Sequence, residues 1–222
     1  MAVGKKAATV AGAQLAPKVA WNFVKSAVDK AIDGVGPLRS AAESATTHMV
    51  DANGDVAKAA QRMIRSHVAI AGVQGFVTNL GGLATLPVTV PANVAGVALL
   101  QAHLVAGIAH LRGYELDDPK VRNAICVVML GEDKVDELVK RHKLPSRPLA
   151  IATAPAYDPE LDRMIAGELT GELVARTVGR RAVTLMARKI PGVGGVVAGG
   201  TDAYSTYQIG QYAIQELPDR RL

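Results

Sequence analysis

Apolar side chains recur along much of the chain at the spacing of a helix. In residues 17–33 they occur every four or five positions, and Pro17 suits a first helical turn. Similar patterns predict further helices: residues 40–50, 56–67, 120–131, 134–142, 160–190 and 201–216. Since no segment alternates apolar and polar residues as a half-buried strand does, we predict an all-α fold.

Several predicted helix ends carry capping residues. Ser40 and Glu43 have the spacing of a capping box, in which each side chain bonds to the other residue's backbone N–H. The Asn53-Gly54 pair favours a turn, and Asp55 directly after it is suited to cap the next helix. We therefore expect the second and third helices to begin close to residues 40 and 55.

An uncharged stretch runs from residue 66 to residue 111. It contains no Asp, Glu, Lys or Arg, and Arg65 and Arg112 stand directly on either side. Pro87 and Pro91 divide it into two apolar arms, which predicts a helical hairpin. We expect this hairpin to form the centre of a single-domain helical bundle, because helices that are apolar all round are buried.

Two environments are open for this hairpin. Each arm has about the 20 residues needed to span the hydrocarbon of a bilayer. The polar side chains of Gln74, Asn79, Asn93 and Gln101 oppose insertion, because each cancels the gain from several apolar residues. The hairpin is therefore either protein core or a segment in contact with a membrane or lipid.

The remaining domain organisation follows from composition. Residues 1–16 are Ala-rich and carry Lys5 and Lys6; they make a poor secretory signal, and disorder is one interpretation. Residues 17–217 form the predicted domain, with a proline-rich internal linker at 143–160 and a tail at 218–222. The length and the 49% hydrophobic content fit one domain with a buried core.

The lone cysteine, Cys126, excludes an intramolecular disulfide framework and cysteine-ligated metal clusters. Without a clear export signal we expect a cytoplasmic protein. Under the membrane hypothesis, we expect the protein to attach peripherally to the inner face of the cell membrane.

Basic residues gather where acidic residues are missing. The net charge is +5, and no acidic residue occurs between Glu172 and Asp202. The basic side chains in this window are candidate contacts for anionic headgroups, with a solvated helix face as the alternative: Arg176, Arg180, Arg181, Arg188 and Lys189. With only 4% aromatic residues available to stack on bases, we expect no nucleic-acid partner.

Six polar residues in the uncharged stretch are candidates to face a ligand: His67, Asn79, Asn93, Gln101, His103 and His110. His103 and His110 are seven residues apart, which places them on one helix face about 10 Å from each other. That distance is too long for both to bind one metal ion, so we assign no metal and no cofactor. His67 is placed to approach from the other arm. The cluster is interpreted as a buried polar network or as a polar spot facing a ligand.

Three blocks of sequence resemble the EcsC family of bacterial proteins. They are AGVQGFVTNLGGLATLP at residues 71–87, VPANVAGVALLQAHLVAGIAHLRGYELDD at 90–118 and IPGVGGVVAGGTDAYST at 190–206. The family is named for an accessory protein encoded beside an ABC transporter. The resemblance implies a helical fold and an association with membranes or transport, but no reaction. The chain departs from the family pattern at His103, where relatives often carry Arg.

Three functional hypotheses follow. The leading one is a non-enzymatic, EcsC-like protein that associates with a membrane, a membrane protein or an apolar or lipid ligand through residues 66–111. The first alternative is a soluble helical module for protein–protein interaction. The second is an enzyme that uses His103 and His110. The sequence indicates no substrate and no oligomeric state.

Overall fold

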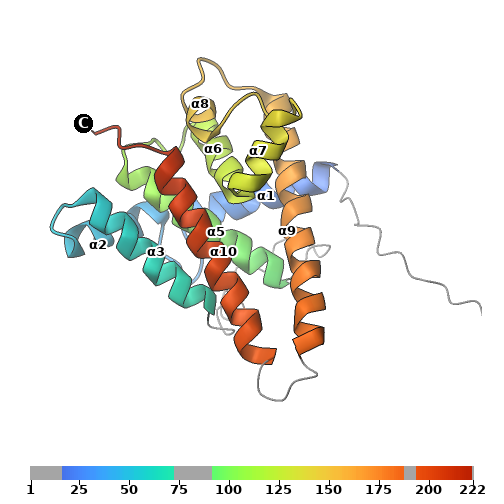
Figure 1. Cartoon of the computed structure of the whole chain (residues 1–222). Coiled ribbons are helices and arrows are strands. Elements are labelled where there is room, and N and C mark those ends of the chain that lie inside the picture. Colours follow the sequence, from blue (N-terminus) through green and yellow to red (C-terminus); the bar gives the residue numbers. More distant parts are fainter. Residues whose placement is uncertain (1–16, 73–91, 188–193, 222) are drawn as a thin grey trace, which may run out of the picture.

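The computed structural model describes residues 17–72, 92–187 and 194–221, with backbone alone for residues 177–187 and for a few others at the segment edges. This part of the chain contains nine helices and no strand, which confirms the all-α prediction (Figure 1). The helices are α1 (Pro17–Asp33), α2 (Ala41–Asp51), α3 (Val56–Gly72), α5 (Ala92–Leu111), α6 (Pro119–Leu130), α7 (Glu132–Lys140), α8 (Pro148–Ala152), α9 (Pro159–Ala187) and α10 (Gly194–Glu216).

The predicted capping interactions are present. The Glu43 backbone N–H donates to Ser40 Oγ at 3.1 Å, and the Ser40 N–H donates to the Glu43 carboxylate at 3.3 Å. At the start of α3 the Lys58 N–H donates to Asp55 Oδ1 at 2.9 Å. These bonds satisfy backbone donors that have no partner inside their own helix, so α2 and α3 begin where the sequence places them.

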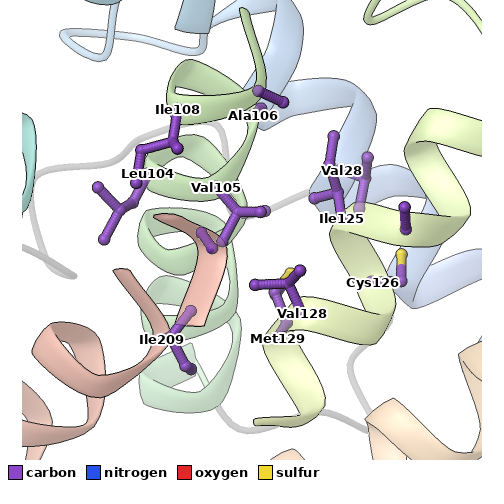
Figure 2. Close-up of a cluster of buried hydrophobic side chains, with 14 of the residues drawn as sticks. Val28, Leu104, Val105, Ala106, Ile108, Ile125, Cys126, Val128, Met129 and Ile209 are labelled. Atoms are coloured by element: carbon purple, nitrogen blue, oxygen red, sulfur yellow. The ribbon is translucent and has the colours of Figure 1, made fainter. Parts of the chain in front are cut away.

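Helix α5 is the centre of the bundle. It packs against α1, α2, α3, α6 and α10, and from residue 95 to residue 111 its residues are buried except Val97 and His110, which are half-buried. Leu104, Val105 and Ile108 lie in a common cluster with side chains of α1, α6 and α10 (Figure 2). The second arm of the predicted hairpin is therefore protein core. The first arm begins within α3, and its remainder, from residue 73 onward, lies outside the described residues.

In the part of the chain that the structure describes, no helix is both long enough and apolar enough to cross a bilayer.

Two predicted helix boundaries were wrong. Residues 66–72 continue α3, because the loss of charge after Arg65 brings apolar residues but no helix-breaking residue. Helix α10 begins at Gly194, seven residues before the predicted start, so part of the glycine-rich segment is helical. The predicted internal linker, residues 143–160, includes α8, which packs on α6, and its residues Leu144 and Ile151 are buried.

Glycine allows α10 to approach α3 closely. A Cβ atom added at Gly210 would lie 2.7 Å from Ile64 Cγ1 and 3.2 Å from Leu104 Cδ2. Ile64 and Leu104 are both buried and belong to the central core. A side chain at position 210 therefore has no room unless α10 moves away from α3 and α5.

We expect Gly210→Ala to lower the free energy of unfolding by about 1–3 kcal/mol through overpacking. The matched control is Gly171→Ala in α9, where a Cβ atom meets nothing within 4 Å. That control should raise stability by about 0.5–1 kcal/mol, because alanine restricts the unfolded chain. Urea unfolding of both variants measures the difference, and equal shifts would contradict the close approach of α10.

Candidate functional site: a buried histidine pair and an open cleft

The structure separates the predicted polar residues into different places. His67 on α3 and His103 on α5 are in direct contact, while Gln101 lies on another side of α5 beside α10. His110 lies at the far end of α5 near the C-terminal residues. Asn79 and the side chain of Asn93 lie outside the described residues. The six residues therefore do not form one site.

The two contacting histidines form a continuous chain of polar contacts. His67 Nε2 lies 2.8 Å from His103 Nδ1, and the rings are stacked with centroids 5.1 Å apart. His67 Nδ1 lies 2.8 Å from the Met63 carbonyl oxygen, one helical turn earlier. His103 Nε2 lies 3.0 Å from the carbonyl oxygen of Arg39, which precedes α2. This arrangement ties α3 and α5 to the connection between α1 and α2.

Burial governs the chemistry of this pair, because His67 is 3% exposed and His103 is 2% exposed. Burial and the neighbouring His103 lower the pKa of His67 to about 3. Burial also lowers the pKa of His103, against the carbonyl groups of Arg39 and Ser40, which favour its charged form. The two inaccessible rings of low basicity are thus linked in one buried chain of polar contacts.

His110 does not share a site with His103. Its carbonyl oxygen accepts a hydrogen bond from Arg221 Nη2 at 2.6 Å, which fastens the C-terminal residues to α5. Burial and the charge of Arg221 lower the pKa of its side chain. The described residues contain no group of three or more His, Cys, Asp and Glu side chains suited to a metal ion.

Arg176, a candidate headgroup contact, bonds inside the protein. Its Nε donates to Glu172 at 2.8 Å, and its other nitrogens donate to the carbonyl groups of Met129 and Leu130. These carbonyls end α6, where a cation is favoured by the helix dipole. Arg176 therefore caps α6. The side chains of Arg180 and Arg181, and all of Arg188 and Lys189, lie outside the described residues.

A cleft of about 900 Å³ opens between α5, α7, α9 and α10. Val97, Leu130, Leu173 and Ile209 give it an apolar floor. Gln101 also lines it, and its Nε2 donates to Ser205 Oγ at 3.2 Å, which joins α5 to α10. Small-molecule sites in proteins commonly combine such an apolar floor with a few polar groups.

The charge of this cleft is predominantly acidic. Its described lining includes five carboxylates and two basic side chains, Lys134 and Arg176. Both basic groups are paired, Lys134 with Glu137 at 3.3 Å and Arg176 with Glu172 at 2.8 Å. Glu132 and Asp133 at the start of α7 are exposed, and no cation of the described chain lies within ion-pair distance of them. Among the described residues, these two rim carboxylates therefore have no ion-pair partner.

Two tyrosines of α10 add aromatic surface to the same cleft. Tyr204 is 63% exposed and Tyr207 is 47% exposed, and the Tyr204 hydroxyl accepts a hydrogen bond from Gln208 at 3.1 Å. They lie three residues apart, which places both on one side of the helix. Neither these tyrosines nor the α7 acids were predicted as site residues from the sequence. The signal that could have found the tyrosines is their three-residue spacing, which is that of one helix face.

Comparison with models of known families, with curated proteins and with solved structures gave no match to this chain. The resemblance to the EcsC family therefore stays a prediction from sequence. The fold and the cleft define the class: a helical bundle of one domain with an open, acidic and aromatic cleft.

Proposed function

We propose that the protein is a non-enzymatic binding protein whose cleft takes a small organic cation with an apolar portion. The observation that carries this proposal is the joint presence of the exposed carboxylates Glu132 and Asp133, exposed tyrosine rings and an apolar floor in one cleft of about 900 Å³. A volume of this size matches the pockets that hold drug-sized ligands.

Each part of the cleft supports a different part of such a ligand. Glu132 and Asp133 attract a positive charge, and the faces of Tyr204 and Tyr207 interact favourably with the same charge. Leu173 and Ile209 offer apolar contact to the rest of the molecule. An anionic ligand would meet the repulsion of the carboxylates and gain none of the aromatic attraction.

The second arm of the predicted hairpin, helix α5, contributes to the wall of this cleft. Val97 and Gln101 of α5 line the cleft, so a ligand in it would touch the uncharged stretch that the sequence analysis singled out. A single-chain amphiphile with a cationic headgroup combines the lipid-like ligand of the leading hypothesis with the chemistry of the cleft. We take this as the ligand class to test.

We expect dodecyltrimethylammonium, below its critical micelle concentration, to bind at one site and at least about tenfold more tightly than dodecyl sulfate, because the rim charges act with opposite sign on the two headgroups. Isothermal titration calorimetry and native mass spectrometry measure affinity and stoichiometry. The variant Glu132→Gln/Asp133→Asn should weaken cation binding about fivefold.

Glu160→Gln is the matched control for this experiment. Glu160 is an exposed carboxylate in the first turn of α9, outside the lining of the cleft, so its loss should leave the affinity unchanged. Equal binding of the two amphiphiles, or equal effects of the rim and control variants, would contradict the proposal.

Attachment to a membrane surface is a second candidate, favoured by the absence of acidic residues between Glu172 and Asp202. It predicts sedimentation with vesicles of anionic lipid that weakens at high salt, and no sedimentation with neutral vesicles. Because the cleft is acidic, this attachment and cleft binding respond oppositely to headgroup charge, and one set of lipids distinguishes them.

A further inference from the structure

Hydrogen bonding in the histidine pair can be counted atom by atom. Three contacts lie in sequence, from the Met63 carbonyl to His67, from His67 to His103, and from His103 to the Arg39 carbonyl. All three are between 2.8 and 3.0 Å. At this separation a contact is favourable only if one of its two atoms carries a proton.

The two ends of this chain of contacts are carbonyl oxygens, which only accept hydrogen bonds. Each of the three contacts therefore needs one ring proton. Two neutral imidazoles supply two protons, one on each ring. In the neutral pair one contact must consist of two facing lone pairs, and a third proton would convert it to a charge-assisted hydrogen bond.

We propose that the His67–His103 pair is a proton-binding site that holds two protons at neutral pH and takes up a third in acid. The geometry supplies a partner for the third proton, and the apolar surroundings oppose the positive charge that it brings. Two of the three contacts join α3 to α5 and α5 to Arg39, and the third lies within α3. The third proton completes all three contacts, so the proton count bears on how firmly this junction is held.

Burial favours the neutral form of the pair, while the carbonyl groups of Met63, Arg39 and Ser40 favour the charged form. The charge of His48 on α2 lowers the pKa of both rings. Asp51 and Arg62 act on His48 in opposite directions. No carboxylate is among the groups that raise the pKa of His67 or His103. Burial therefore dominates near neutral pH.

The proton count has a mechanical consequence. Any opened form that exposes the rings to water binds the third proton more readily than the closed form does. Below pH 6.5, the usual pKa of an exposed histidine, each pH unit should raise the population of the opened form by up to about tenfold per proton. The pair thus makes the junction of α3, α5 and the α1–α2 connection sensitive to acid.

Nitrogen NMR of the full chain, labelled at the histidine rings, counts these protons directly. The variants His67→Gln and His103→Gln assign the signals, and through-bond correlations assign them if a variant fails to fold. At pH 7 we expect two protonated and two bare ring nitrogens in the pair. On acidification we expect the folded protein to gain one further ring proton.

Two results would overturn the proposal. Three protonated nitrogens at pH 7 would show that the pair is charged at neutral pH. Two protonated nitrogens at every pH down to acid unfolding would show that the folded pair takes up no third proton.

Discussion

Replacing Leu104 by Ala is expected to lower the free energy of unfolding by about 2–5 kcal/mol. Leu104 is fully buried on α5, in the cluster shown in Figure 2. It lies beside Gly210 and Ile64. Gly210 has no side chain that could move into the space left by the lost methyl groups, so the cavity cannot close from that side. We therefore expect a loss in the upper part of the range, because cost rises with residual cavity volume.

Leu149→Ala in α8 is the control for the same chemical change. Leu149 is 37% exposed, so its truncation should cost within about 1 kcal/mol. Urea unfolding of both variants without detergent measures the two losses. A cost for Leu104→Ala as small as that of the control would mean that α5 does not form the core in solution, and the interpretation of this arm as lipid-facing would then gain support.

The elements that the sequence predicted well are those encoded by a few neighbouring residues. The start of α2 depends on Ser40 and Glu43, and the start of α3 depends on Asp55, so local hydrogen bonds were sufficient to place them. The end of α3 and the start of α10 were misplaced. These two helices pack on each other, and a contact between segments so far apart in sequence has no local pattern from which it could be predicted.

The candidate site also combines features that the sequence predicted with features that depend on the packing of distant segments. The approach of His67 to His103 was foreseeable, because both belong to the same uncharged stretch. The third partner was not, since the contact from Arg39 is a backbone carbonyl and has no side-chain signature. The cleft was invisible for another reason: its acids come from α7 and its tyrosines from α10, and only the packing of separate helices brings them together.

Acidification is expected to destabilise the protein by about 1.4 kcal/mol per pH unit for each histidine that stays neutral when folded. The folded pKa of His67 is about 3, below its unfolded value of 6.5. Below pH 6.5 the unfolded chain therefore binds more protons than the folded chain. The contribution of His67 to stability is complete above pH 6.5 and is lost as the pH falls toward 3. At pH 5 the loss from His67 alone should reach about 2 kcal/mol.

Comparison of variants isolates the histidine pair from other titrating groups. The pKa values of His48 and His110 are also lowered by burial, so the wild-type slope contains their share. Urea unfolding at pH 7, 6 and 5 should give a slope for His67→Gln that is flatter by up to about 1.4 kcal/mol per pH unit. Gly171→Ala in α9 removes no titratable group and should leave the slope unchanged. If the wild-type and His67→Gln proteins lost stability equally between pH 7 and pH 5, His67 would not bind its proton preferentially in the unfolded chain, and its low folded pKa would be contradicted.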